Sequence, residues 1–180
     1  MIYGFFLYFC KMNLTEINKT LFSQAKALKM CDAVHREWYG KSLDASALAD
    51  LYFQNTDFCI DYHWPAPSVL KDLFDIDTLR SNGFVVDDKW SLLNPSRATI
   101  VGVSYSKIRF NGFGAGTIYV CDESAVEVTA KGRSFVVVHV YDDAIATVIC
   151  DATARAIVIN HSKFSKITTK GQTTIKECNG

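Results

Sequence analysis

The stretch Asp142–Val158 reads DDAIATVICDATARAIV, and it repeats its own pattern after ten residues. In its first half Ala144, Ala146 and Val148 follow Asp142 at every second position. In its second half, after Asp151, the same order recurs as Ala154, Ala156 and Val158. Alternation with a period of two is typical of a β-strand. The recurrence after ten residues predicts a repeat architecture, so we interpret the stretch mainly as scaffold.

The ten-residue pattern extends over residues 101–160. In each ten the fourth residue is small, and the second is Gly or Asp in every ten but the last, which has Ala152. Small residues, Gly and Asp suit tight corners. The sixth, eighth and tenth residues are predicted to face inward along strands. The eighth is always aliphatic and β-branched: Ile108, Ile118, Val128, Val138, Val148 and Val158.

Ten residues supply one strand of about six residues and one corner, so two tens would make one flattened coil. This favours a short β-solenoid of three coils with two parallel sheets. An antiparallel β-meander or sandwich is the alternative, because it also tolerates an even period. In the solenoid, residues twenty apart are neighbours, and Lys107 would lie beside Glu127 as a favourable charge pair.

One outer face of the predicted solenoid is unusually apolar. Its residues come from alternate tens and would form one contiguous patch, which we expect to be covered by the N-terminal helices, through Leu21, Leu28 and Leu51, or by another chain. The predicted interaction face consists of Tyr119, Phe135, Val137, His139, Ile157 and Ile159.

The N-terminal part has helical periodicity, so the expected fold class is α+β with a small helical head over residues 12–81. Asn13 and Glu16 form a predicted capping box for a first helix to about residue 30. A second is expected to end at Gly40, a third to run from Ser42 to about residue 62, and a fourth to cover 67–74.

The remaining segments complete the expected domain organisation. Residues 1–11 are interpreted as a non-essential extension, because a helix start directly follows Met12. Residues 82–97 are predicted to be a linker with a short hairpin, and residues 98–162 to be the β-repeat domain. Residues 163–180 leave the repeat register and are expected to be an irregular, lysine-rich C-terminal cap.

Composition narrows the possible functions. Arg and Lys number 19, as do Asp and Glu, so no basic excess indicates nucleic-acid binding. The apolar run Ile2–Cys10 is far shorter than the ~20 residues that span a bilayer. The six cysteines have no metal-binding spacing, which indicates free thiols in a reducing compartment. We therefore expect a cytoplasmic protein without metal, cofactor, membrane or nucleic-acid partner.

Two sets of residues are candidates for catalysis. Carboxylates gather at the predicted corners, and such pairs serve glycosidases, although aspartate is also an ordinary corner residue. His139 could form an acid/base pair with Asp143 or His161, but no serine or cysteine is placed as a nucleophile. The candidate catalytic carboxylates are Glu123, Asp142, Asp143 and Asp151.

Several stretches carry a resemblance to known sequences: MNLTEINKTLFSQAKAL from Met12, DFCIDYHWP, NGFGAGTIYV and DDAIATVICDATARAIVI. Together they resemble a group of uncharacterised small proteins encoded by gut Bacteroidetes and by their phages and mobile elements. The resemblance spans residue 12 to the C-terminus. It implies an intracellular bacterial or phage context, and it implies no activity or site residues.

The expected function is therefore a non-enzymatic one. A helical head and a β-solenoid would present a surface to a protein partner or to a second copy, as an accessory protein, an inhibitor of a host system or a minor structural component. The alternative is a carbohydrate-active or other hydrolase that uses the corner carboxylates.

Overall fold

The computed structural model describes residues 13–38, 41 and 43–178, without the side chain of Glu37. The chain divides into two compact units, one ending at Thr78 and the other beginning at Leu79. The predicted extension 1–11 and the predicted stop at Gly40 lie outside the described residues. None of the helices in the described part is long and apolar enough to cross a membrane.

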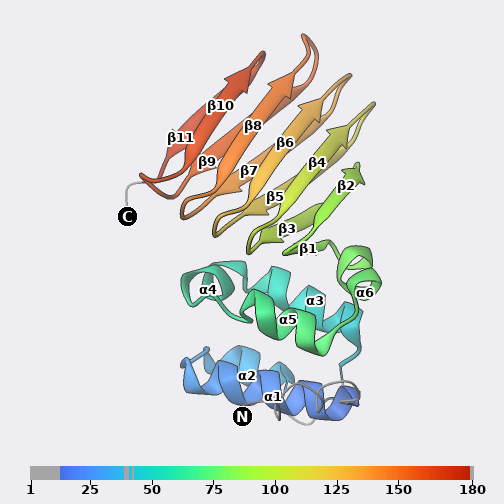
Figure 1. The fold of residues 1–180 in the computed structure, drawn as a ribbon, viewed down its shortest axis with the longest axis vertical. Helices are drawn as coiled ribbons and strands as arrows, with labels where there is room; N and C mark the ends of the chain where they lie inside the picture. Colours follow the sequence, from blue (N-terminus) through green and yellow to red (C-terminus); the bar gives the residue numbers. More distant parts are fainter. Residues whose placement is uncertain (1–12, 39–40, 42, 179–180) are drawn as a thin grey trace, which may run out of the picture. The chain divides into compact units, whose positions relative to one another are not determined.

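The first unit is helical (Figure 1). Its first helix begins with the predicted capping box, in which Asn13 and Glu16 exchange side-chain and backbone hydrogen bonds. The predicted third helix is instead two helices that meet at Asn55, and Asp44 caps the first of them by accepting from the Ala47 N–H. The predicted cap Ser42 lies outside the described residues. The helices are α1 (Leu14–Ala27), α2 (Asp32–Trp38), α3 (Ala45–Gln54), α4 (Thr56–Asp61) and α5 (Pro67–Leu73).

Buried polar contacts fix the packing of this unit. Asn18 is buried in α1, donates to the Leu43 carbonyl and accepts from the Trp38 indole N–H at 3.1 Å. The indole of Trp64 donates to Gln24 and lies 5.9 Å from Trp38 between ring centroids. Both tryptophans are buried and form part of the core of this unit.

A sixth helix, α6 (Ile76–Ser81), was not predicted. Asp75 precedes it and accepts hydrogen bonds from the backbone and hydroxyl of Thr78, which is how an N-cap residue acts. The short Asp-Ile-Asp-Thr sequence was the available signal for this helix start.

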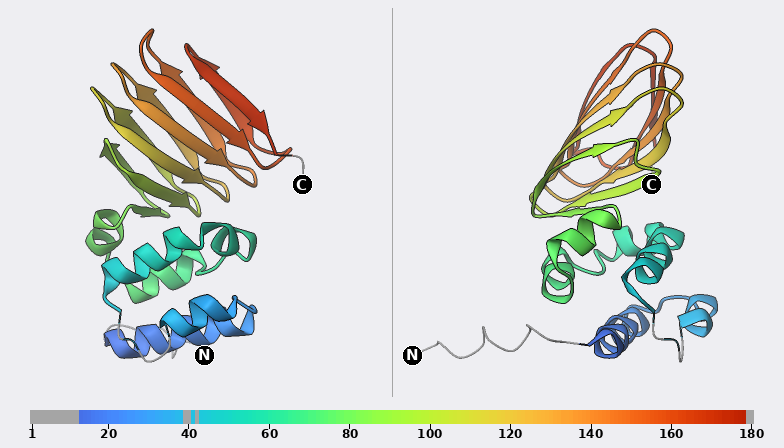
Figure 2. Two further views of the ribbon diagram at one scale, coloured as in Figure 1. Left: turned by 180° about the vertical axis from the view of Figure 1, so that it is seen from behind. Right: turned by 90° about the vertical axis from the view of Figure 1, so that its right-hand side faces the viewer.

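The second unit is a β-solenoid of two parallel sheets, drawn from green to red in Figure 1, and its coils are seen obliquely as stacked loops in the right-hand view of Figure 2. Every strand pair is parallel, so the antiparallel meander was wrong. Sheet A contains β1 (Phe84–Val86), β3 (Arg97–Val101), β5 (Ala115–Val120), β7 (Phe135–Val140), β9 (Arg155–Asn160) and β11 (Thr173–Glu177). Sheet B contains β2 (Lys89–Leu93), β4 (Tyr105–Phe110), β6 (Ala125–Ala130), β8 (Ile145–Cys150) and β10 (Lys166–Lys170).

The ten-residue pattern gives the correct inward set. Strands twenty residues apart pair in register, as in Ile118 with Val138 and Val138 with Val158. All eighth residues of the tens are buried, Val138 completely. Gly116, at an inward sixth position, leaves room for the Phe110 ring, which an added Cβ would meet at 3.0 Å.

The solenoid is longer at both ends than predicted. The expected hairpin at 82–97 is instead its first coil, because β1 pairs in parallel with β3 and β2 with β4. The expected irregular cap contains β10 and β11, which pair in parallel with β8 and β9. In this last coil the inward positions carry Ile167 and Ile175 together with the polar Thr169, Thr173 and Glu177, and the polar side chains help to end the core.

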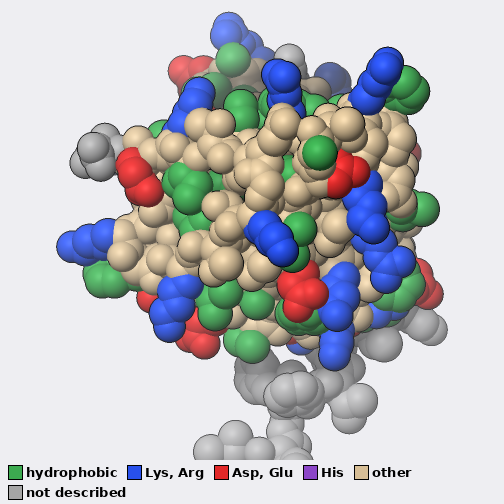
Figure 3. Space-filling model, turned by 90° about the horizontal axis from the view of Figure 1, so that it is seen from above, with side chains coloured by type: hydrophobic (Ala, Val, Ile, Leu, Met, Phe, Trp, Pro, Cys, Tyr) green, Lys and Arg blue, Asp and Glu red, His purple; other side chains and the backbone are tan. Residues whose placement is uncertain are grey.

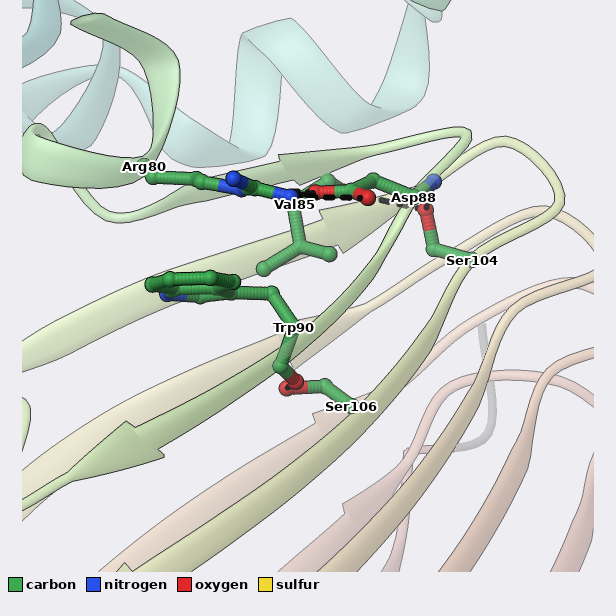
Figure 4. Close-up of polar contacts among 6 residues, drawn as sticks. All are labelled: Arg80, Val85, Asp88, Trp90, Ser104 and Ser106. Atoms are coloured by element: carbon green, nitrogen blue, oxygen red, sulfur yellow. Dashed lines mark hydrogen bonds and ion pairs between the residues drawn. The ribbon is translucent and has the colours of Figure 1, made fainter. Parts of the chain in front are cut away.

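The first coil carries a cap of its own, shown in Figure 4. Trp90 pairs with inward-facing Ser106 but has no coil before it, and it remains 40 % exposed. The Arg80 guanidinium lies 4.0 Å from its ring and donates to Asp88 through Nε and Nη2 at 2.9 and 3.1 Å. This hydrogen bonding lowers the pKa of Asp88. The arrangement covers an apolar end without a further strand.

Candidate interaction surface

The outer face of sheet A brings the predicted interaction residues together. Phe135, Val137 and His139 project outward from β7, because their neighbours Val136 and Val138 are buried in the core. Parallel register then places Val137 between Thr117 and Ile157, and His139 between Tyr119 and Ile159. We call Tyr119, Phe135, Val137, His139, Ile157 and Ile159 the sheet A patch.

The patch is accessible but shallow. Phe135 is 42 % exposed, and the other five side chains are partly buried. No acidic residue occupies an outward position on β3, β5, β7, β9 or β11. Three outward positions carry a basic residue: Arg97, Arg155 and Lys176. The strands of this face therefore carry an apolar centre and basic residues at its margins, while the acidic residues Glu123, Asp142 and Asp143 lie at the corners beyond the strands.

An aromatic cluster closes the patch at one end of the strands. Tyr119 lies 4.9 Å from His139 between ring centroids, and Tyr141 lies 4.1 Å from His161 with ring planes only 6° apart. His139 Nδ1 and His161 Nε2 are 2.9 Å apart, so one ring donates to the other. The structure thus places His139 and His161 in direct contact.

Tyr141 is the member of this cluster that the sequence reading missed. It occupies the first position of its ten, which was assigned to neither face of the strand. Since residues twenty apart stack, its position beside His161 follows from the coil length.

The outer face of sheet B differs from sheet A in charge. Glu127 accepts from the Tyr105 hydroxyl at 2.5 Å and pairs with Lys107 at 3.5 Å. Ile145 and Ile149 follow on β8 and are 43 % and 42 % exposed. These two isoleucines make sheet B a useful internal comparison, because they are as exposed as Phe135 but lie beside a charged cluster.

Two corner aspartates are used in the scaffold. Asp142 accepts from the Asp122 N–H at 2.9 Å, and Asp122 accepts from the Gly102 N–H at 2.7 Å. The three residues have positive φ angles of 51°, 57° and 74°. Aspartate tolerates this left-handed conformation, and its side chain here joins each corner to the preceding coil.

Asp151 shapes the corner in which Ala152 breaks the pattern. Its carboxylate accepts from the N–H groups of Gly132, Thr153 and Ala154 at 2.8 to 2.9 Å. These hydrogen bonds, with that of Gly132 the largest cause, lower the pKa of Asp151 to about 2. Asp151 is therefore an ionised hydrogen-bond acceptor over the ordinary pH range, the opposite of a general acid.

The four candidate carboxylates do not form one group. Glu123, Asp142 and Asp143 lie at corners that follow sheet A strands, and Asp151 follows β8. The six residues of β8 separate Asp151 from Asp142 and Asp143, a length of ~20 Å. Glu123 and Asp143 hold equivalent exposed positions in successive coils, and Asp142 is already engaged by the backbone.

The buried cysteines have no reactive character. Burial raises the pKa of Cys59 and Cys150, and raises that of Cys121 well above its usual range. A thiol with a raised pKa is a poor nucleophile.

Comparisons with protein-family models, with curated proteins and with solved structures found no match to this chain.

Proposed function

We propose that the protein is a non-enzymatic interaction protein and that the sheet A patch binds a different protein with an apolar centre and an acidic rim. The observation that carries this proposal is the continuity of the patch. Three successive strands contribute outward aromatic and aliphatic side chains, and their parallel register places those side chains side by side. Solvated strands usually carry polar residues at such positions.

The rim charge selects the kind of partner. With Arg155 and Lys176 at the rim and no acidic outward residue on the described strands of sheet A, two copies of this face would bring like charges together. An acidic rim on the partner would instead be attracted. A second copy is thus the less favoured occupant, and sedimentation distinguishes it.

The size of the face indicates a weak or transient complex. Strands ~20 Å long and ~4.8 Å apart give about 300 to 500 Å² of sheet for the three to five strands concerned. Stable interfaces bury about 800 Å² per partner, so sheet A alone falls below that size. A regulatory contact fits this area better than a permanent assembly.

The biological setting is part of the same proposal. A phage or mobile-element accessory protein in the bacterial cytoplasm, acting as an inhibitor of a host system or as a minor structural component, would need a binding face and no catalytic centre. The resemblance of the sequence supports this setting. The alternative hydrolase has weaker support, because backbone groups engage Asp142 and Asp151 and β8 separates the two.

The test uses paired variants on the two sheets. Val137→Lys with Ile157→Lys introduces charge into the sheet A patch, and Ile145→Lys with Ile149→Lys makes the same change on sheet B. Both pairs are outward, so we expect thermal melts close to wild type. Proteins captured from a bacterial lysate by wild type and by the sheet B variant, but not by the sheet A variant, are purified and re-tested. A dimer or larger species in sedimentation of wild type and of the sheet B variant, but not of the sheet A variant, would instead indicate self-association through the patch, and equal capture by all three proteins contradicts the proposal.

A further inference from the structure

The last coil leaves main-chain groups of β10 open. β10 is the final strand of sheet B, and no described strand lies on its outer side. Lys166 N–H donates to the Ala144 carbonyl, toward β8. Main-chain groups alternate sides along a strand, so those of Thr168 also face β8, while those of Ile167 and Thr169 face the open edge.

Basic residues are in excess near this edge. Residues 161–178 contain four lysines and one acidic residue, Glu177. Figure 3 shows Lys and Arg side chains, with fewer Asp and Glu side chains between them, around the rim of this end, over a surface made largely of backbone and polar side chains. Lys166 and Lys170 are exposed on the outer side of β10, and neither makes an ion pair among the described residues.

We propose that the edge of β10 binds an extended acidic segment of another protein, which adds to sheet B as a further parallel strand. Its N–H and C=O groups would pair with those of Ile167 and Thr169. In this added strand, the acidic residues two positions before and two positions after the central residue would lie beside Lys166 and Lys170. An apolar residue between the first acidic residue and the central one would lie beside the partly buried Ile167.

Charge distinguishes this partner from a second copy. Open strand edges promote pairing between identical chains, and lysines at an edge oppose it. Two copies joined at β10 would place Lys166 and Lys170 beside lysines of the other chain, whereas an acidic strand removes that repulsion. The same lysines thus disfavour self-association and favour a partner of opposite charge.

This inference goes beyond the proposed function, since β10 is in sheet B and the sheet A patch is not needed for it. The probe is an acetylated, amidated and fluorescently labelled peptide, Glu-Val-Thr-Val-Glu, with outward Glu, Thr and Glu matching Lys166, Thr168 and Lys170. Binding to the full chain is followed by fluorescence anisotropy. We expect saturable binding that weakens with salt and that the Val137→Lys/Ile157→Lys variant retains.

Two control probes separate strand addition from charge attraction. A peptide with proline in place of the central threonine keeps both charges but lacks an N–H that would face β10, so we expect it not to bind. A single-stranded oligodeoxythymidine tests for a general polyanion site. If the proline peptide binds as well as the first, or if the oligonucleotide displaces the first peptide at equal concentration, the proposal is overturned.

Variants of the chain complete the test. Lys166→Glu with Lys170→Glu should weaken peptide binding about tenfold or more, while Lys26→Glu with Lys131→Glu, an equal charge change elsewhere, should not. Thr169→Pro should keep the fold and lose the peptide, because this N–H faces the open edge. Thr168→Pro, which removes a hydrogen bond to β8, should lower the melting temperature. Undetectable peptide binding by the wild type, or full binding by folded Thr169→Pro, contradicts the proposal.

Discussion

Lys107 and Glu127 lie side by side on the outer face of sheet B, with Nζ and Oε2 3.5 Å apart, although twenty residues separate them in the chain. The same spacing stacks Val137 on Ile157. The ion pair and the sheet A patch therefore both depend on a coil length of twenty residues. Hydrogen bonding from Tyr105 and the charge of Lys107 lower the pKa of Glu127, so the pair is ionised at neutral pH.

Reversal of this pair provides the first prediction. Glu127→Lys should lower the melting temperature slightly, because two lysines would then adjoin, and Lys107→Glu with Glu127→Lys should restore part of the loss. Both side chains are half exposed, so the effect is small and should fade in high salt. Thermal melts at two salt concentrations measure it. No recovery in the double variant would contradict the register.

Neighbouring residues on β7 should respond in opposite ways to the same substitution. Val138 is fully buried, and Val138→Asp places an unpaired charge in the core, which should cost at least about 4 kcal/mol and prevent folding. Val137→Asp changes the next residue, which faces outward, and should fold. Circular dichroism of both variants decides the assignment. A native spectrum for Val138→Asp would show that its strand does not face inward.

A close approach of the backbone at Gly116 leaves no room for a side chain. A Cβ there would collide with the Pro95 carbonyl and crowd the Phe110 ring, so Gly116→Ala should cost about 1 to 3 kcal/mol. At Gly112 a Cβ would meet no atom within 4 Å, so the loss of stability in Gly112→Ala comes only from the left-handed backbone, whose φ is +65°. Chemical denaturation should therefore show the larger loss for Gly116→Ala. Equal losses would argue against the packing of Phe110.

Asp151 makes stability depend on pH in a defined direction. Its pKa is about 2 in the folded protein and ~3.9 in an unfolded chain, so its contribution is complete above pH ~4 and is lost as the pH falls toward 2. Asp151→Asn leaves one acceptor oxygen and should lose the Gly132 hydrogen bond. The melting temperatures of variant and wild type should thus differ at pH 7 and converge near pH 2. A difference that persists unchanged to pH 2 would exclude this role.

The middle of the solenoid could be predicted because every coil there contains two equal tens. The ends could not. Lys89 pairs with Tyr105, sixteen residues later, and Ala156 pairs with Thr173, seventeen residues later. A fixed period of ten places these strands out of register and therefore predicts a hairpin and a cap in their place. Corners of other lengths, shorter before β4 and β11 and longer before β10, change the period without changing the parallel strand pairing.

The candidate site was predictable to a similar extent. Alternation along β7 identifies Val137 and His139 as outward, and the coil length identifies their neighbours. The coil length also places Tyr141 beside His161, but the ring stacking depends on side-chain orientations just beyond the strands, which the repeat pattern does not give. Whether Asp151 is a catalytic or a scaffold residue also depends on backbone N–H groups, which no side-chain pattern reveals.

The equilibrium affinity of a purified captured partner for three forms of the protein is the most direct test of the sheet A patch. Isothermal titration calorimetry would compare wild type, Val137→Lys with Ile157→Lys, and Ile145→Lys with Ile149→Lys. Burial of two lysines in the apolar centre of an interface should weaken binding about 100-fold, whereas the sheet B variant should bind like wild type. Equal affinity of a folded sheet A variant and the wild type would contradict the proposal that this face binds the partner.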